Sequence, residues 1–324
     1  MSLAKRLLPS LAVVAFVATA YSAHAQPVTV RVGHGTGVEE QLYLMKARPD
    51  VTPNQGKVYN LDYYLFPGTD KRFQAYEAGA LDVMSGTTHA VLLAASEGMN
   101  VKAVASIARE SSQGFLTSFM ALTSSGINSV QDLKGKTIGI NGLKASTHLF
   151  AMFALRKAGL DPERDVTFVP SPFSAQGTAV RTGKIDVGVF LQPFAHLEQK
   201  RGGIKTVFTS RTGAAGDEEL SLLLVNPDFA TKNAAVMHAF VSDFVIATKY
   251  YLDNSRDARK ALLDAKFIRV EPEIYYEMED SYRVRDGRVD VDSLKRVQEM
   301  QIEAGFQRKR VDVERLVDQQ YLPK

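Results

Sequence analysis

The sequence predicts an α/β protein built from two similar lobes. Without an expected N-terminal leader the chain keeps about 300 residues, which exceeds the usual size of a single hydrophobic core. A strand, a loop and a helix follow one another at the start of the mature chain and again after residue 135. One motif, a helix end followed by a short strand, also occurs in both halves of the chain.

The first 25 residues have the pattern of a secretory signal peptide. Lys5 and Arg6 precede an apolar stretch, residues 7–20, and Ala23-His24-Ala25 forms an A-x-A cleavage signal. We expect cleavage after Ala25, so that the mature protein begins at Gln26 and is exported. A membrane anchor is the competing interpretation, but the apolar stretch is too short for one. The mature protein is therefore expected to be soluble and periplasmic.

Charge and cysteine content exclude several classes of function. The formal net charge of +3 falls by two, to +1, when Lys5 and Arg6 are removed, so nucleic-acid binding has no electrostatic support. The chain contains no cysteine, which excludes disulfides, thiolate metal sites and a lipidated N-terminal cysteine. The fold must then be stabilised by its hydrophobic cores.

The first strand, loop and helix begin at Val28. Residues 28–32 are apolar and β-branched, residues 33–37 form a glycine-rich loop, and a helical pattern continues to Ala47. In the second unit, Gly135 turns the chain into a strand over residues 137–140. A loop and a helix that ends at Gly159 follow, with Ser146 or Thr147 as the expected N-cap.

A shared segment suggests that the two halves are structural duplicates. Residues 75–83 align with residues 179–187, and each segment reads as a helix end, a tight turn and a buried strand. Gly79 and Gly183 are expected to adopt the left-handed conformation that terminates a helix.

The lobe boundaries follow from the apolar segments on either side of the second unit. Residues 115–123 and 220–225 are interpreted as the connections between the lobes, and the helical chain from Ala234 onward is expected to pack on the first lobe. The predicted organisation is a signal peptide over residues 1–25, a first lobe over 26–118 and 222–324, and a second lobe over 119–221.

Ligands in open α/β sheets bind beyond the carboxyl ends of the strands, which directs attention to four loops. These loops are Gly33 to Val38, Ser85 to His89, Asn141 to Thr147, and Leu191 to His196. In the second and third loops, hydroxyl groups, free backbone N–H groups and a helix N-terminus coincide, an arrangement that favours an anionic group. For any single hydroxyl, simple N-capping is the alternative interpretation.

The sequence does not contain the common catalytic and cofactor motifs. The loop at Gly33 lacks the third glycine of a dinucleotide fingerprint, and no P-loop, G-x-S-x-G or H-E-x-x-H motif occurs. A nucleophile and base assembled from Ser85 or Ser146 with His89 or His148 remains open, although no spacing favours it. We therefore expect neither an enzyme nor a cofactor.

Four of the five histidines of the mature chain lie in or beside these loops: His34, His89, His148 and His196. Converging imidazoles can bind zinc or a similar metal ion. Each histidine can equally line the ligand site or face solvent. No neighbouring carboxylate completes a ligand set, so no metal site is assigned.

At these residues the sequence resembles the nitrate/sulfonate/taurine-binding family of periplasmic receptors of ABC importers, a branch of the thiamine-pyrimidine-synthase-like group. The matching text is V-Q-D-L-K-G-K-T-I-G-I at residues 130–140, K-A-G-L at 157–160, and the two G-x-L/I-D-V segments. These motifs in this order, after a signal peptide, are more specific than any one of them alone. The resemblance extends from about Val28 to Asp228.

This resemblance implies a type II periplasmic-binding-protein fold, with two α/β lobes, two crossing segments and a ligand cleft between the lobes. The ligand-binding residues that we predict from the loops and the resemblance are Gly35, Thr36, Gly37, Ser85, Gly86, Thr87, Thr88, Lys144, Ala145, Ser146, Thr147 and Gln192. Many family members have an acidic residue where this chain has Gln192, and the neutral amide opposes an anionic ligand less. Phe173 and Phe194 are expected either to form an apolar wall or to lie in the core.

The expected function is that of a monomeric receptor that delivers a small organic anion to an inner-membrane ABC permease. Sulfonates, taurine-like compounds and aromatic carboxylates are the candidate ligands. Lys144 in one lobe and the helix start at Thr87 and Thr88 in the other are expected to hold the anion, with a solvated loop lysine as the alternative interpretation of Lys144. A metal-binding receptor that uses the four histidines is one alternative. A pyrimidine-precursor-related protein or enzyme is the other, but that branch resembles a cysteine-bearing pattern that this chain cannot form.

Overall fold

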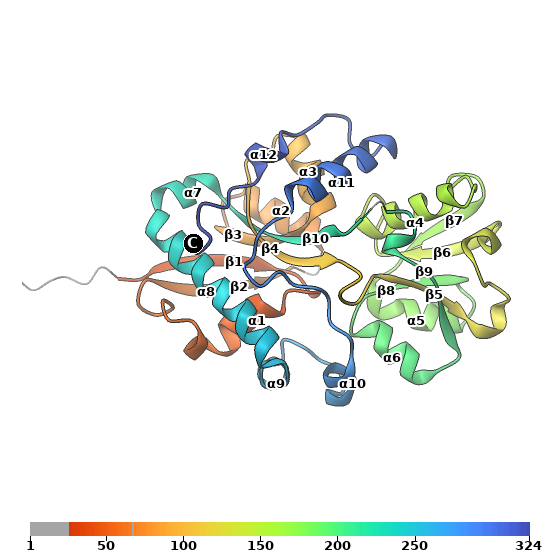
Figure 1. The fold of residues 1–324 in the computed structure, drawn as a ribbon, viewed down its shortest axis with the longest axis horizontal. Coiled ribbons are helices and arrows are strands. Elements are labelled where there is room, and N and C mark those ends of the chain that lie inside the picture. Colours follow the sequence, from red (N-terminus) through yellow and green to blue (C-terminus); the bar gives the residue numbers. More distant parts are fainter. Residues whose placement is uncertain (1–25, 67, 215) are drawn as a thin grey trace, which may run out of the picture.

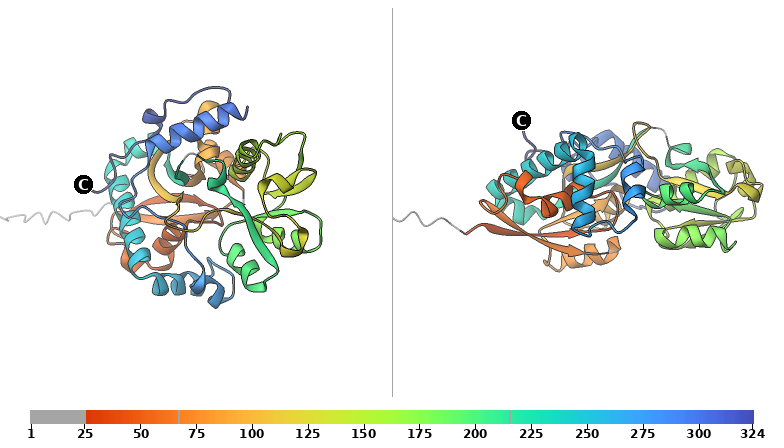
Figure 2. Two further views of the ribbon diagram at one scale, coloured as in Figure 1. Left: turned by 45° about the vertical axis from the view of Figure 1, so that its right-hand side comes forward. Right: turned by 90° about the horizontal axis from the view of Figure 1, so that it is seen from below.

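The structure is a computed structural model that describes residues 26–66, 68–214 and 216–324. Two α/β lobes lie side by side along the long axis of the molecule (Figure 1). The views in Figure 2 show the same division, with the C-terminal helices gathered on the lobe that also contains the start of the described chain. The expected signal peptide, residues 1–25, lies outside the described residues.

The first lobe contains a five-stranded sheet with the strand order β2-β1-β3-β10-β4. Its strands are β1 (Val28–His34), β2 (Tyr59–Leu65), β3 (Val83–Thr87), β4 (Lys102–Glu110) and β10 (Glu218–Val225). Strand β1 pairs in parallel with β2 and β3, whereas β10 runs antiparallel to both β3 and β4.

The second lobe repeats this arrangement with the strand order β7-β6-β8-β5-β9. Its strands are β5 (Ser118–Leu122), β6 (Lys136–Ile140), β7 (Val166–Pro170), β8 (Val187–Phe190) and β9 (Ile204–Thr209). Strand β6 pairs in parallel with β7 and β8, and β5 runs antiparallel to β8 and β9. The two sheets therefore correspond strand by strand, which confirms the predicted two-lobed α/β fold.

Helices cover the faces of both sheets (Figure 1). The helices of the first lobe are α1 (Glu40–Ala47), α2 (Thr69–Glu77), α3 (Thr88–Ser96), α7 (Pro227–Lys232), α8 (Ala234–Asp253), α9 (Ser255–Asp264), α10 (Pro272–Glu277), α11 (Val291–Glu303) and α12 (Val313–Leu316). The second lobe has α4 (Ser146–Lys157), α5 (Phe173–Arg181) and α6 (Phe194–Arg201). Short 3₁₀ helices cover η1 (Pro49–Val51), η2 (Thr123–Ser125), η3 (Val130–Leu133) and η4 (Ser210–Thr212). Among the described helices none is long and apolar enough to span a membrane.

Each lobe has its own hydrophobic core. In the first lobe, α1 and α8 pack on one face of the sheet through side chains such as Leu42 and Phe244, and Val91 and Leu294 lie in a separate cluster. In the second lobe, Phe119 of β5 stacks on Phe208 of β9 with ring centroids 4.2 Å apart. Separate cores let the lobes keep their internal structure while their relative position changes.

The motif shared by the two halves has the same structure in both lobes. Gly79 and Gly183 follow α2 and α5 with φ values of 73° and 69°, so the predicted left-handed helix ends are confirmed. Three residues later, the carboxylate of Asp82 accepts a hydrogen bond from the backbone N–H of Arg31 in β1. Asp186 accepts the equivalent bond from Thr137 in β6. Each aspartate thus ties the start of one strand to its parallel neighbour.

The chain crosses between the sheets twice, between Glu110 and Ser118 and again between η4 and Glu218. Residues 220–225, which the sequence suggested as a connection, instead form most of β10. Every residue of β10 is buried, because the strand is paired on both sides and helices cover its faces. A central strand of this kind is a continuous apolar run and is easily mistaken for a connection.

Candidate functional site

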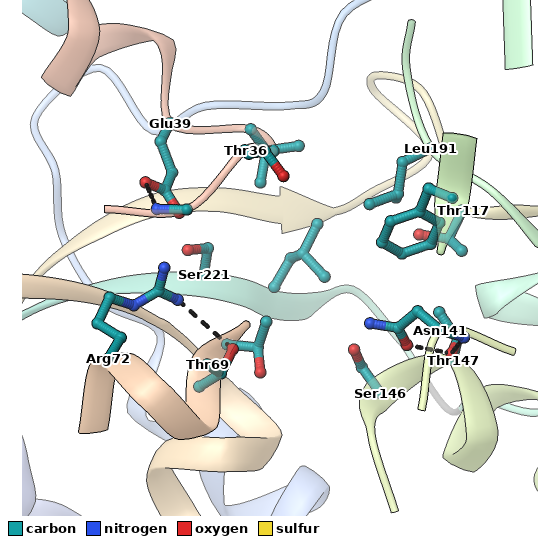
Figure 3. Close-up of a pocket in the computed structure, with 16 residues that line it drawn as sticks. Thr36, Glu39, Thr69, Arg72, Thr117, Asn141, Ser146, Thr147, Leu191 and Ser221 are labelled. Carbon is teal, nitrogen blue, oxygen red and sulfur yellow. Dashed lines mark hydrogen bonds between the residues drawn. The ribbon is translucent and has the colours of Figure 1, made fainter. Parts of the chain in front are cut away.

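A cavity of about 120 Å³ lies between the two lobes and takes its walls from both of them (Figure 3). We call it the interlobe cavity. Its lining residues are Gly35, Thr36, Gly37, Val38, Glu39, Thr69, Arg72, Thr87, Thr117, Asn141, Ser146, Thr147, Phe173, Leu191, Leu220 and Ser221. A second hollow of about 650 Å³, the outer hollow, shares several of these residues, among them Thr36, Asn141, Phe173 and Leu191.

The structure brings six of the twelve predicted ligand residues to the interlobe cavity: Gly35, Thr36, Gly37, Thr87, Ser146 and Thr147. Gln192 lines the outer hollow. A ligand contact at any of these residues remains a prediction.

The other five predicted residues line neither of these spaces. Ser85 and Thr88 are fully buried, and a side chain at Gly86 would collide with Leu224. Ala145 is the N-cap residue of α4. Lys144 lines a different hollow, together with Gly305, Phe306, Arg308 and Lys309. The predicted pairing of Lys144 with Thr87 around one ligand group therefore does not match this geometry, since Thr87 lies in the interlobe cavity.

Glu39 fixes the loop after β1. Its Oε2 accepts a hydrogen bond from the backbone N–H of Gly35 at 2.9 Å, and its Oε1 accepts one from the Ser85 hydroxyl at 2.7 Å. The Tyr43 hydroxyl donates to the Gly35 carbonyl at 2.9 Å. A Cβ at Gly35 would lie 2.7 Å from Nη1 of Arg72, so only glycine lets the loop pass this close to the guanidinium.

In the second lobe the loop after β6 leads into α4. Helix α4 begins at Ser146, and its N-cap residue is Ala145, which supplies no side-chain cap, so neither expected N-cap is correct. The Thr147 hydroxyl is used inside the loop, where it donates to Oδ1 of Asn141 at 2.6 Å. Ser146 lies at the first turn of α4 and lines the cavity opposite the first lobe (Figure 3).

Several cavity residues lie outside the four predicted loops: Glu39, Thr69, Arg72, Thr117, Leu220 and Ser221. Arg72 is the cation among them. It lies on α2 with 4% of its surface exposed. Within the described parts of the chain it forms no ion pair, and the one hydrogen bond of its side chain, from Nη2 to the Thr69 hydroxyl, is long at 3.5 Å. A signal was present in the sequence, because Phe73 and Tyr76 follow Arg72 at the spacing of one buried helix face.

Apolar side chains form the remaining wall. Phe173, Leu191 and Leu220 line the interlobe cavity together with Val38. The sequence left open whether Phe173 forms an apolar wall or lies in the core. In the structure Phe173 does both, because it lines the cavity and also packs against the core of the second lobe.

The four histidines near the loops each contact different neighbouring residues. His34 packs against Tyr43 and Tyr63, His89 against Phe150, His148 against Phe168 and Phe306, and His196 lies 3.8 Å from Glu277. Burial lowers the pKa of His89 to about 3 and that of His148 to about 4. In the described ranges no three histidine, aspartate or glutamate side chains group as metal ligands. The metal-binding alternative gains no support from this geometry.

The sequence profile of the NMT1/THI5 like family matches residues 60–258, which is more than half of the chain. The chain belongs to this family. A riboflavin-binding protein, RibY of Chloroflexus aurantiacus, is 27% identical over 164 residues. That match covers 51% of this chain and 45% of RibY, so it includes less than half of the relative.

Solved structures confirm the fold of this family member. The aliphatic sulphonate binding protein SsuA of Escherichia coli superposes with a TM-score of 0.73 at 18% identity, covering 90% of this chain and 92% of SsuA. The alkanesulfonate-binding SsuA of Xanthomonas axonopodis pv. citri, bound to MOPS, gives 0.72 at 18% identity, with 91% and 99% covered. A zinc-bound ligand-binding component of an ABC-type import system from Staphylococcus aureus gives 0.74 at 12% identity, with 91% and 97% covered.

These comparisons confirm the resemblance that the sequence indicated. The fold is that of the periplasmic binding proteins, and its structural neighbours include binding components of ABC importers. At these low identities the structural likeness establishes the fold, and the ligand has to be inferred from the cavity itself.

Proposed function

We propose that this protein is a monomeric periplasmic receptor that captures a small organic anion between its lobes and delivers it to an ABC import permease of the inner membrane. The observation that carries the proposal is the interlobe cavity, whose walls come from both lobes. A ligand that contacts both walls favours the closed arrangement by its differential affinity. The permease then recognises the closed, loaded form.

Two helix starts support an anionic ligand. Thr87 is the N-cap residue of α3, Ser146 is the first residue of α4, and both line the cavity from opposite lobes. The free N–H groups and the dipole at a helix start favour negative charge. Two structural neighbours are sulfonate-binding proteins, which agrees with this chemistry.

Contacts across the lobes are consistent with capture by closure. His89 of α3 packs edge-on against Phe150 of α4, with ring centroids 5.4 Å apart. On the other flank, Lys200 of α6 forms an ion pair with Glu277 of α10. Opening the cleft would break both contacts, so they contribute to the stability of the closed form.

The cavity gives no support to an enzymatic alternative. The Ser85 hydroxyl donates to Glu39 rather than to a histidine. Neither ring nitrogen of His89 has a hydrogen-bond partner among the described residues. A serine nucleophile requires a base within hydrogen-bond reach, and these pairs do not form one.

Native mass spectrometry of protein isolated from the periplasmic fraction of its host tests the proposal. We expect a retained small anion, and a smaller radius of gyration by X-ray scattering when the stripped protein rebinds it. Riboflavin, which RibY is named for binding, would be recognised by its visible absorbance and would contradict the anion assignment. Recovery of the mature protein from the cytoplasm would contradict the periplasmic assignment.

Two glycine variants provide a matched pair for this experiment. Among the described residues, a Cβ at Gly37 would come within 4 Å of Leu191 alone, at 3.9 Å. Because Gly37 lines the interlobe cavity, we expect Gly37→Phe to fill it without straining the backbone. Gly142→Phe adds the same group to a loop position that lines neither the cavity nor the outer hollow. Retention and closure should be lost in Gly37→Phe and kept in Gly142→Phe. Equal retention in both variants would place the ligand elsewhere.

A further inference from the structure

We propose that Arg72 holds the negatively charged group of the ligand, and that the ligand is a singly charged carboxylate or sulfonate with an apolar body. This inference rests on the proposed function, because it specifies the chemistry of the same cavity. It assigns the anion to a residue of α2 in the first lobe rather than to Lys144 or to the helix starts alone.

Within the described parts of the protein the guanidinium of Arg72 forms no ion pair and no well-formed hydrogen bond. Arg72 is 96% buried, its Nε has no hydrogen-bond partner, and its Nη2 makes only the long bond to Thr69. A guanidinium keeps its positive charge in proteins, and a buried unpaired charge is strongly unfavourable. A ligand anion would supply the missing partner.

Glu39 is the nearby carboxylate, and its oxygens are already bonded. One accepts the N–H of Gly35 and the other accepts the hydroxyl of Ser85. Gly35 lies against both groups, since a Cβ there would be 2.7 Å from Arg72 Nη1 and 3.0 Å from Glu39 Oε1. No nitrogen of Arg72 comes within ion-pair distance of Glu39 in the described structure, so the carboxylate partly balances the buried positive charge but leaves the N–H donors free. Its negative charge repels a second charge on the ligand, which favours a monoanion.

The rest of the cavity selects against a free inorganic anion. Phe173, Leu191 and Leu220 present an apolar surface to a ligand bound at Arg72. A planar guanidinium binds the oxygens of a carboxylate or sulfonate through paired N–H groups. An alkyl or aryl body attached to that group displaces water from the apolar wall. The outer hollow shares Phe173 and Leu191, so a longer body has room to extend.

The first test uses the ligand-free protein, prepared by unfolding, dialysis and refolding. We expect Arg72→Met to raise the melting temperature, because it replaces a buried guanidinium whose donors are largely unsatisfied with an apolar side chain of similar length, while Glu39 keeps its hydrogen bonds to Gly35 and Ser85. The control is Lys71→Met, which removes the exposed cation next to it on the same helix and should leave melting unchanged. A melting temperature lowered by Arg72→Met would show that the protein itself uses the charge, and would overturn the inference.

The second test measures binding of benzenesulfonate, with benzenesulfonamide as its neutral counterpart. Wild type and Lys71→Met should prefer the sulfonate, and Arg72→Met should lose affinity for it by about 10- to 100-fold, the range for one charge-assisted hydrogen bond. Arg72→Lys should fall between them, because an ammonium lacks the paired N–H geometry. Equal affinity of wild type for both probes, or a loss caused by Lys144→Met instead of Arg72→Met, would overturn the inference.

The two proposals fail in different ways. A wild-type protein that closes on a retained neutral or cationic molecule, with the affinity unchanged in Arg72→Met, refutes the role of Arg72 and leaves the receptor function standing. A wild-type protein that retains no molecule and closes on none refutes the receptor function. In that case the melting temperature of Arg72→Met still decides whether the donors of Arg72 are unsatisfied in the ligand-free protein.

Discussion

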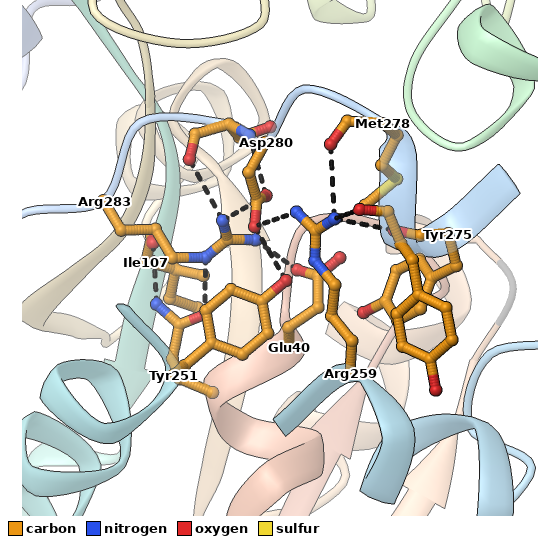
Figure 4. Close-up of polar contacts among 11 residues, drawn as sticks. Glu40, Ile107, Tyr251, Arg259, Tyr275, Met278, Asp280 and Arg283 are labelled. Carbon is orange, nitrogen blue, oxygen red and sulfur yellow. Dashed lines mark hydrogen bonds and ion pairs between the residues drawn. The ribbon is translucent and has the colours of Figure 1, made fainter. Parts of the chain in front are cut away.

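Arg72 and Arg283 are both buried in the first lobe, but their surroundings are opposite. The side chain of Arg283 is completely buried and forms ion pairs with Glu40 of α1 and with Asp280 (Figure 4). It also donates to the Ser281 carbonyl and to the amide of Gln41. Arg72 has no comparable partner in the described chain and faces the interlobe cavity.

The partners of Arg283 explain its role. Asp280 also pairs with Arg259 of α9 at 3.1 Å, and Arg259 donates to the carbonyls at the end of α10. Burial opposes ionisation of Asp280, but the two guanidinium groups hold the pKa of its carboxyl below the usual range. The network connects α1 with the segment that follows α10, so its charges stabilise the fold.

Burial alone therefore does not mark a functional arginine. A buried cation whose donors are all used inside the protein is structural, whereas one whose donors are left free beside a cavity is available to a ligand.

Removing the charge of Arg283 should have the largest effect. Arg283→Met leaves Glu40 and Asp280 without their shared partner in the protein interior, and we expect a loss of about 3–5 kcal/mol in the free energy of unfolding. Urea denaturation followed by circular dichroism measures this loss. Arg285→Met is the control, because Arg285 forms an exposed pair with Asp253 that should contribute less than about 1 kcal/mol. Equal effects of the two variants would remove the contrast with Arg72.

Glu218 is a buried carboxyl group near the segments that cross between the lobes. It is 2% exposed, lies opposite Glu110 in the pairing of β10 with β4, and its Oε2 has no partner among the described residues. Burial, together with the charge of Glu110, raises the pKa of Glu218 to about 8, although Arg296 and Arg211 counteract part of the shift. The group is therefore protonated in the folded protein at neutral pH.

This shift predicts a pH dependence of stability. Because the folded pKa lies above the ordinary value of 4.5, the folded state binds a proton that the unfolded state releases. The contribution of Glu218 is thus fully present below about pH 4.5 and is lost as the pH rises toward 8. Glu218→Gln should melt at a higher temperature than wild type at pH 8, and the difference should shrink toward pH 4.5. A difference that does not change with pH would contradict the assignment.

Glu277 should give the smallest effect, because its ion pair with Lys200 is exposed to solvent. Lys200 holds the pKa of this carboxyl below its usual range. Glu277→Gln removes a contact between the lobes, so we expect a slight shift toward the open form in X-ray scattering without ligand. Glu273→Gln on the same helix is the control, and an identical shift in both variants would exclude a specific contact. A shift as large as that caused by filling the cavity would show that surface charge, rather than the cavity, controls closure.

The sequence alone determined the features that depend on local chemistry. Gly79 and Gly183 were predicted as helix ends because a left-handed residue is required there, and the φ values agree. The repeated order of strand, loop and helix predicted two similar lobes, since hydrophobic periodicity and turn residues act over a few positions. The loops that contribute Gly35, Thr87 and Ser146 to the cavity were predicted from strand ends for the same reason.

The tertiary structure alone decided which polar side chains reach the cavity. Lys144 belongs to a predicted loop, but it lines another hollow with Phe306 and Arg308, which lie far from it in the sequence. Arg72 belongs to no predicted loop, but the packing of α2 brings its guanidinium to the cavity beside Gly35. Whether a buried charge is paired depends on residues that are distant along the chain, such as Glu40 and Arg283. Periodicity and short motifs describe only residues that are near neighbours in the sequence. The absence of a close partner for Arg72 therefore became apparent only in the folded molecule.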